Sequence, residues 1–336
     1  MGKVNPRCSG VSCEIVQVGI LRHEVGSRVA GQMLTDVSSA SGKVGSCWCV
    51  VGRVMIRRTF LLSLGFWTHL AATPIPDEAF RDGLAIGCQA YSFKEFSAFE
   101  AIAKTKESGG TLIEFYPGQK LKPDSPAGEI VSHNASDQVI RELKAECVRQ
   151  QISPVNYGVV AASSGVEIRK IMEFAKTMGL YGVCTESTEW VAEWEKAAKE
   201  FDIHVAFHQH AGTMSKPNYK VWHPLYILGV VESRDPRLGA CADLGHWCSS
   251  GLKPVDCLRI LKGRIISVHL KDKSEMGSQA VVVPAGKGVV DVAACIAELK
   301  KQDFKGHFSI EHENDWNNSV PKIKESMDFT KAEWAK

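Results

Sequence analysis

From Leu84 to the end of the chain, short apolar runs alternate with stretches of helical periodicity, and this feature constrains the fold more than any other. Strands that alternate with helices form parallel sheets, because each helix returns the chain over the sheet by a right-handed crossover. The eight strand-like runs lie at residues 84–93, 111–117, 152–160, 181–187, 203–211, 239–245, 264–272 and 306–313. Eight such units close into a (β/α)8 TIM barrel, and residues 84–336 have about the length that this barrel needs.

The expected helices present an apolar face toward the sheet. Phe96, Phe99 and Ile102 keep helical spacing, and the two glycines at 109 and 110 end that helix. Further helices are predicted at residues 137–150, 166–178, 190–201, 255–261 and 292–301. We expect residues 74–83, which contain two prolines, to form a linker in front of the barrel.

The region before the barrel has a different character. Residues 1–54 lack sustained periodicity and are predicted to be a leader that is disordered or not translated. Residues 55–73 start with a basic segment, continue with a short apolar stretch and end with small residues, which resembles a bacterial export peptide. Arg57 and Arg58 further resemble the twin-arginine type. We expect export to the periplasm if translation starts at Met55, and a cytoplasmic protein if this segment is only an amphipathic helix.

Charge and hydropathy indicate which classes of binding partner the chain can have. The chain of 336 residues has 40 basic and 38 acidic side chains, a formal net charge of +2, and the two signs are mixed along it. This balance offers no basic surface for nucleic acid or anionic lipid. The apolar stretch in residues 55–73 is shorter than the roughly 20 residues of a membrane span. We therefore expect a small neutral or weakly polar substrate, no nucleic acid, no membrane span and, as an open possibility, a homo-oligomer.

The eleven cysteines have no spacing that marks a cofactor site. Their positions match neither a zinc ribbon nor a disulfide framework. Cys88, Cys184 and Cys241 lie inside apolar strand runs, where a free cysteine usually acts as a small buried hydrophobe. We therefore expect structural thiols rather than redox or metal-binding ones.

Polar side chains close the apolar runs in the second half of the predicted barrel. His208 lies near the end of the fifth run, Asp243 of the sixth, His269 of the seventh and Glu311 of the eighth. The carboxyl ends of parallel strands meet at one rim, so these residues can converge on one ion. Carboxylates combined with neutral imidazoles suit Mn, Zn, Fe or Co, whereas oxygen-only sites favour Mg or Ca. The sequence thus predicts a divalent metal bound by these four residues.

Each predicted ligand also has a structural interpretation. Asp243 stands at the start of a loop, where an aspartate can serve as a helix N-cap or turn residue. His269 can be a core histidine with satisfied hydrogen bonds. His208 and His210 are two positions apart on one strand and face the same side. We assign His208 to the metal and His210 to the substrate, although either can instead orient a neighbouring carboxylate.

Three further side chains belong to the same rim. Glu114 closes the second run and Glu186 the fourth, and either can be an ordinary acid at a helix start, where the dipole favours it. Lys271 follows His269 by two positions and can stabilise an oxyanion, although a solvated surface lysine fits the sequence almost as well. The run Pro284-Ala285-Gly286-Lys287-Gly288 resembles a phosphate-binding loop, but it completes no known pattern, and a tight turn explains its glycines.

The chain resembles the xylose isomerase-like TIM barrel family of sugar phosphate isomerases and epimerases, roughly over residues 84–316. The segments that carry the resemblance are QAYSF, IEFYPG, AFHQH, CADLGHWCSSGLKP, VHLKDK, PAGKGVVD and SIEHEND. The resemblance implies a divalent metal, often Mn, held by one residue each from strands five to eight. In the ketose epimerases of the family the strand-five ligand is a glutamate that also moves a proton, whereas this chain has His208 there.

The resemblance also implies a reaction. Our leading expectation is a metal-dependent sugar isomerase or epimerase that removes a proton next to a carbonyl and passes through an enediolate. Glu311 or Glu186 would act as the base, His246 or His210 would carry protons between oxygens, and Lys271 would hold negative charge. Tyr91, His210 and Glu114 are expected to contact the substrate.

Other functions remain open at this stage. A metal-dependent lyase on 3-keto-glycosides would share the first step and then expel a leaving group. A DNA-repair enzyme similar to endonuclease IV would use the same barrel, but the balanced charge disfavours it. A non-catalytic binding protein with a degenerate site is the last alternative.

Overall fold

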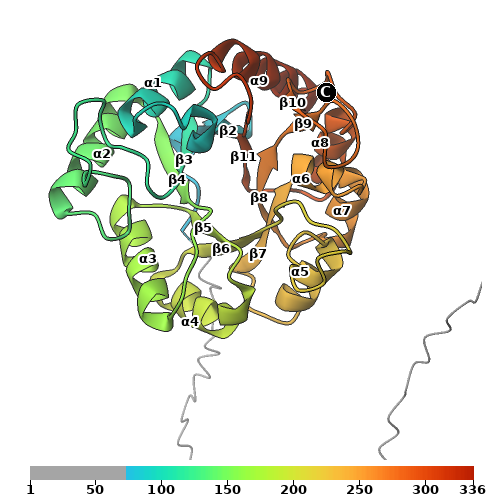
Figure 1. Ribbon diagram of the computed structural model, residues 1–336, viewed down its shortest axis with the longest axis horizontal. Coiled ribbons are helices and arrows are strands. Elements are labelled where there is room, and N and C mark those ends of the chain that lie inside the picture. The colour runs from blue at the N-terminus through green and yellow to red at the C-terminus, as the bar shows by residue number, and fades with distance from the viewer. Residues whose placement is uncertain (1–72) are drawn as a thin grey trace, which may run out of the picture. The chain divides into compact units, whose positions relative to one another are not determined.

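The computed structural model describes residues 73–336, which form a closed parallel barrel surrounded by helices (Figure 1). Its strands are β2 (Leu84–Gln89), β3 (Leu112–Phe115), β4 (Ser153–Tyr157), β5 (Gly182–Thr185), β6 (His204–His208), β7 (Leu238–Asp243), β8 (Ile265–Leu270) and β11 (His307–Ile310). Each pairs in parallel with its neighbours, and pairing of β2 with both β3 and β11 closes the ring. The predicted (β/α)8 TIM barrel is therefore confirmed.

The helices cover the outside of the barrel. They are α1 (Ala98–Glu107), α2 (Asp137–Gln150), α3 (Gly165–Met178), α4 (Val191–Phe201), α5 (Pro224–Val231), α6 (Leu244–Ser249), α7 (Pro254–Ile260), α8 (Val292–Lys301) and α9 (Val320–Trp334). Local signals set their starts: the Ser97 side chain accepts a hydrogen bond from the backbone N–H of Glu100, whose carboxylate binds the backbone N–H of Ser97 in return. Helix α5 was not among the predicted helices, because its sequence PLYILGVV is apolar on every side and shows no helical stripe.

The segment at residues 74–83, which we expected to be a linker, packs against the amino-terminal end of the barrel. Asp77–Ala79 form a short 3-10 turn (η1), and Phe80–Arg81 (β1) pair antiparallel with the start of β2. Ile75 and Ala79 are buried in one apolar cluster with barrel residues such as Leu112 and Val155. Burial of these side chains fixes the segment in place, so it closes the bottom of the barrel.

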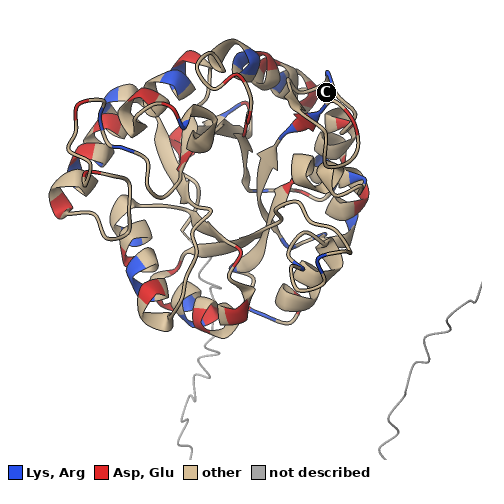
Figure 2. Cartoon of the chain, viewed as in Figure 1, with Lys and Arg blue, Asp and Glu red and all other residues tan. Residues whose placement is uncertain are grey.

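The predictions about the amino-terminal part of the chain concern residues 1–73. The leader at 1–54 and the export segment at 55–73 lie, except for Thr73, outside the described residues. Within residues 73–336 no helix is both long and apolar enough to cross a bilayer. Basic and acidic residues are both spread over the helices around the ring (Figure 2).

Candidate functional site

The four predicted metal ligands meet at the carboxyl-terminal rim. His208 and Asp243 are the last residues of β6 and β7, His269 lies near the end of β8, and Glu311 directly follows β11. The register pairs Asp243 with His269 across β7 and β8, and Ser309 with His269 across β11 and β8. One ligand atom from each of the four side chains lies within 4.8 Å of the others.

The donor set fits a divalent cation. Nδ1 of His269 and Oε2 of Glu311 are buried and make no hydrogen bond of good geometry, although they lie 3.0 Å from each other and Oε2 also lies 3.0 Å from Nζ of Lys271. Buried polar atoms without partners are unfavourable unless a cation or water compensates them. Oδ2 of Asp243 lies 3.4 Å from Nε2 of His208 and 3.6 Å from Nδ1 of His269. Two imidazoles and two carboxylates that face one point are a donor set that suits a transition metal.

Asp243 combines the two roles that the sequence left as alternatives. Its Oδ1 accepts a hydrogen bond of 2.7 Å from the backbone N–H of His246 and thereby caps α6. Its Oδ2 faces the other ligands. The cap therefore fixes the carboxylate in the orientation that a cation at the rim needs.

A carboxylate stands behind each of the two ligand histidines. Oε1 of Glu186 lies 3.0 Å from Nδ1 of His208, and Oε2 of Glu114 lies 3.0 Å from Nε2 of His269. Such pairs fix the ring orientation and leave the other nitrogen free to bind a metal. The nitrogens that face the centre are consequently Nε2 of His208 and Nδ1 of His269.

These contacts place Glu114 and Glu186 differently from our expectation. Glu114 is fully buried beneath the rim, where it also accepts a hydrogen bond from Ser309, and it does not line the cavity. This position makes it a partner of His269 and keeps it from the substrate contact predicted above. Glu186 additionally accepts a hydrogen bond of 2.9 Å from Tyr219, so its carboxylate is held between two donors.

The charge on His208 follows from its partners. Burial disfavours the charged imidazolium, but hydrogen bonds to Asp243 and Glu186 outweigh burial and raise the pKa of His208 to about 9. In the absence of a cation this histidine is therefore protonated at neutral pH. Because a ligand imidazole must be neutral, metal binding would displace that proton.

Lys271 is buried at the centre of the site, which rules out a solvated surface lysine. Its Nζ lies 3.1 Å from Asp243, 3.0 Å from Glu311 and 2.9 Å from Glu313. Burial alone would lower the pKa of Lys271, but the three carboxylates raise it well above its usual value. The ammonium group also donates to Nε2 of His246 at 3.0 Å.

A cavity of about 240 Å³ opens above these residues. It is lined by Gln89, Tyr91, Tyr116, Pro117, Val159, His208, His210, His246, Glu311 and Glu313. The His210 ring stacks on the His246 ring with centroids 4.1 Å apart. Of the predicted substrate-contacting residues, Tyr91 and His210 line this cavity, and Tyr91 packs edge-on against Tyr116.

Sequence reasoning missed three groups at this site. Tyr116 and Glu313 belong to the segments IEFYPG and SIEHEND, so their proximity to the predicted ligands was the available signal. Tyr219 lies on the long loop after β6, and nothing in its local sequence links it to Glu186.

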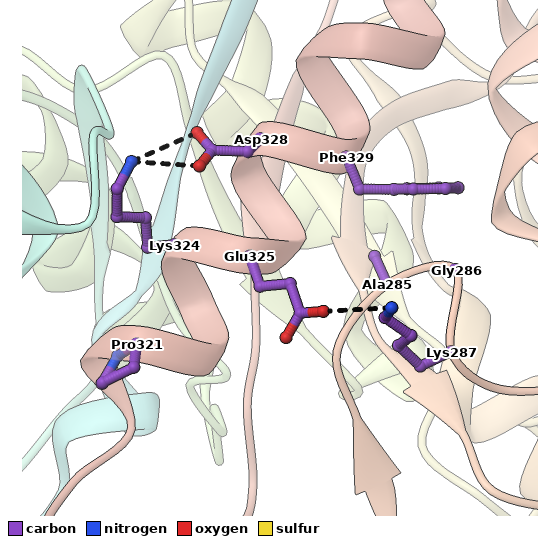
Figure 3. A pocket seen from close by; sticks show the side chains of 8 residues that line it. All are labelled: Ala285, Gly286, Lys287, Pro321, Lys324, Glu325, Asp328 and Phe329. Carbon is purple, nitrogen blue, oxygen red and sulfur yellow. Dashed lines mark hydrogen bonds and ion pairs between the residues drawn. The ribbon is translucent and has the colours of Figure 1, made fainter.

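The glycine-rich run at 284–288 binds an internal carboxylate. Asp272 is buried and accepts hydrogen bonds from the backbone N–H groups of Gly286, Gly288 and Val290 at 2.9 to 3.0 Å. The Asp272 carboxylate therefore occupies the backbone N–H groups that a phosphate-binding loop would offer to a phosphate. In the pocket beside this loop, the side chains of Glu325 and Lys287 point toward each other (Figure 3), as an ion pair with 3.4 Å between Oε1 and Nζ.

Comparison with known proteins assigns the family. The model of the xylose isomerase-like TIM barrel matches residues 102–333. The chain belongs to the xylose isomerase-like TIM barrel family. The resemblance noted from the motifs is thereby confirmed.

Its curated relatives include a rhizopine catabolism protein and inosose dehydratases. The rhizopine catabolism protein MocC of Rhizobium meliloti is 30% identical over 138 residues, which are 36% of this chain and 40% of that protein. An inosose dehydratase of Bacillus cereus is 30% identical over 137 residues, 36% of this chain and 44% of the enzyme. The chain thus spans about two fifths of the length of the curated relatives it matches.

Solved structures share the whole barrel. An uncharacterized protein from Parabacteroides distasonis has a TM-score of 0.60 at 29% identity, over 74% of this chain and 99% of that one. A D-allulose 3-epimerase from Methylomonas sp. has a TM-score of 0.58 at 16% identity, over 74% of this chain and 98% of that one. At this identity the epimerase shows a common fold.

Proposed function

We propose that this protein is a divalent-metal-dependent enzyme that removes a proton next to the carbonyl group of a small keto-sugar. The observation that carries this proposal is the convergence of four ligand atoms within 4.8 Å of one another at the base of a cavity on the rim. His208 and Glu311 belong both to the ligand set and to the cavity lining. A small molecule in the cavity would therefore contact the centre directly.

The residues that would hold the cation are His208, Asp243, His269 and Glu311. A bound divalent ion would polarise the substrate carbonyl as a Lewis acid. We propose Mn, in line with the family resemblance, and Zn, Co, Fe and Mg are the alternatives that a metal analysis must compare.

Glu311 is the base in this proposal. Burial alone would raise the pKa of Glu311, but the charges of Lys271 and His269 outweigh burial and hold it well below its usual value. The carboxylate is therefore ionised at neutral pH and faces the cavity, as a group that accepts a carbon-bound proton must. Its low basicity means that the reaction depends on a substrate C–H group made more acidic by the neighbouring polarised carbonyl.

His246 and Lys271 form the side of the site that would hold a substrate oxygen. Burial holds the pKa of His246 well below its usual value, so the imidazole is neutral at pH 7. The charged Lys271 donates to its Nε2 and would also stabilise negative charge that develops on a substrate oxygen. His210, stacked on His246 and 55% exposed, connects this pair with solvent.

Isomerisation or epimerisation is our first candidate outcome, and elimination from a 3-keto-glycoside is the second. Two observations favour the second. The relatives include an inosose dehydratase. Glu186 is held by hydrogen bonds with His208 and Tyr219, so it is not a free second base.

Incubation in deuterated water separates the two outcomes. The Mn-loaded protein would be mixed with keto-sugars and with 3-keto-glycosides, and the products analysed by NMR and mass spectrometry. Solvent deuterium in an intact sugar supports isomerisation, and release of the aglycone supports elimination. Glu311→Gln should abolish either reaction, whereas the exposed control Glu325→Gln should retain it. If the wild-type protein exchanges no carbon-bound hydrogen with any of these substrates, the proposal is wrong.

We also retain export through residues 55–73 as a proposal. Twin-arginine export moves folded proteins, which would suit an enzyme loaded with its metal before export. N-terminal sequencing of the native protein tests this, because a mature chain that begins near residue 73 supports cleavage and one that begins at Met1 contradicts it.

A further inference from the structure

A second group of metal-binding side chains lies inside the barrel, below the rim. Cys184 on β5, Cys241 on β7 and His269 on β8 each offer one ligand atom within 4.8 Å of the others. All three side chains are fully buried. The two cysteines belong to the apolar cluster that fills the barrel interior together with residues such as Ala206.

The surroundings of this group are polar for a barrel interior. Sγ of Cys184 accepts a hydrogen bond of 3.3 Å from Nδ2 of Asn156 and lies 3.9 Å from Oγ of Ser267. Oε1 of Glu114 and Oδ1 of Asn156 are buried and have no hydrogen-bond partner. Buried acceptors without a donor call for compensation by a cation or a water molecule.

We propose that Cys184, Cys241 and His269 form an interior site for one thiophilic divalent cation, with Zn²⁺ as the expected ion. Thiolates and an imidazole are the ligands that zinc prefers, whereas Mn²⁺ and Mg²⁺ prefer oxygen. This site lies below the centre at the rim, shares His269 with it and does not depend on the reaction proposed above.

Charge balance favours occupancy by a doubly charged ion. Each cysteine loses one proton when it binds a metal. Two protons leave, the proton on Nε2 of His269 moves to Nδ1 and one doubly charged ion enters, so the net charge of the barrel interior does not change. A neutral exchange avoids the large cost of adding a net charge to a buried site.

The two sites share His269 through opposite nitrogens. Nδ1 faces Asp243 and Glu311 at the rim, so the interior ion must use Nε2. At present Nε2 lies 3.0 Å from Glu114. The interior ion would therefore displace both Glu114 and the proton from this nitrogen, and the released carboxylate would serve as a fourth ligand. Because that proton moves to Nδ1, the interior ion and the rim ion bind His269 as alternatives.

Titration of the full chain with Cd²⁺ tests the proposal, because thiolate ligands give an ultraviolet charge-transfer band. The variant Cys184→Ser/Cys241→Ser should lose the amplitude of two thiolates relative to wild type. Cys88→Ser, which removes an equally buried strand cysteine, should keep the wild-type amplitude. Four of the eleven cysteines precede residue 73, so only the difference between variants is interpreted.

The variant Asp243→Asn/Glu311→Gln separates the two sites. It should lose Mn²⁺ binding at the rim and keep the full cadmium band, so failure of one proposal leaves the other testable. A wild-type band equal to that of the double cysteine variant overturns the interior site.

Diffraction gives a test that does not depend on whether the cysteine variants fold. Wild-type crystals soaked in Zn²⁺ should show an anomalous peak about 2.3 Å from both sulfur atoms. Absence of density between Cys184 and Cys241 in Zn²⁺-soaked crystals of the Asp243→Asn/Glu311→Gln variant, whose rim site does not bind metal, overturns the proposal.

Discussion

Glu114→Gln tests whether the carboxylate behind His269 controls the affinity for the metal. In the structure Oε2 of Glu114 lies 3.0 Å from Nε2 of His269 and accepts a hydrogen bond of 3.0 Å from Ser309. The substitution keeps the shape of the side chain and removes its charge. A glutamine can also present its NH₂ group to the histidine, which would favour the wrong tautomer for binding through Nδ1.

The expected effect is a moderate loss of affinity. Replacement of a carboxylate that orients a ligand histidine typically weakens metal binding about 10- to 100-fold. This corresponds to about 1.4 to 2.7 kcal/mol of binding free energy. The loss of metal affinity should exceed that caused by removing the charge of a remote buried carboxylate. Glu114 contacts the ligand His269 directly, and because it is fully buried its charge is only weakly screened.

Isothermal titration with Mn²⁺, together with the electron paramagnetic resonance signal of free Mn²⁺, measures this affinity. The matched control is Glu298→Gln, which removes the charge of a buried glutamate on α8. Thermal unfolding of each variant shows whether it is folded. If the Glu114 variant is folded and binds Mn²⁺ within threefold of wild type, while the control behaves the same way, the role assigned to Glu114 is refuted.

Three further predictions concern stability and metal dependence. Burial lowers the pKa of His307 to about 4, so between pH 6.5 and pH 4 the unfolded state binds a proton that the native state does not. The free energy of unfolding is therefore unaffected by this group above about pH 6.5 and falls as the pH falls toward 4, by about 2 kcal/mol at pH 5. Urea unfolding at pH 7 and pH 5 should show a smaller difference for His307→Asn than for wild type, and an equal difference contradicts this. Gly87→Ala should destabilise the fold by at least about 3 kcal/mol, because its Cβ would lie 1.7 Å from the carbonyl oxygen of Leu112, whereas Gly128→Ala, with no atom within 4 Å, should unfold at the wild-type temperature. Removal of metal by a chelator should abolish hydrogen exchange on a keto-sugar and Mn²⁺ should restore it, and activity that survives complete chelation speaks against a metal-dependent reaction.

The barrel could be predicted from sequence because its signals are local. Helix α2 has the bounds that were predicted for it, residues 137–150, since Ser136 caps its start and apolar side chains recur along one face. Helix α5 lacks such a face and was missed. The segment at 74–83 was predicted to be a linker because the two prolines suggest a loop, and only the packed structure shows what Ile75 and Ala79 bury.

The convergence of the four candidate ligand residues was predictable for a related reason. His208, Asp243, His269 and Glu311 close strands, and parallel strands end at one rim, so topology brings them together without knowledge of side-chain packing. The contact of Glu114 with His269 joins β3 to β8 across the interior, and the sequence contains no signal for it. The burial of Lys271 among carboxylates likewise depends on how three strand ends approach each other.

Diffraction from Mn²⁺-soaked crystals, with anomalous data collected near the manganese edge, tests the central claim most directly. The account predicts one ion per chain at the rim, about 2.0 to 2.3 Å from Nε2 of His208, Oδ2 of Asp243, Nδ1 of His269 and a carboxylate oxygen of Glu311. An ion bound elsewhere, or no anomalous density at the rim in a saturating concentration of Mn²⁺, would contradict it.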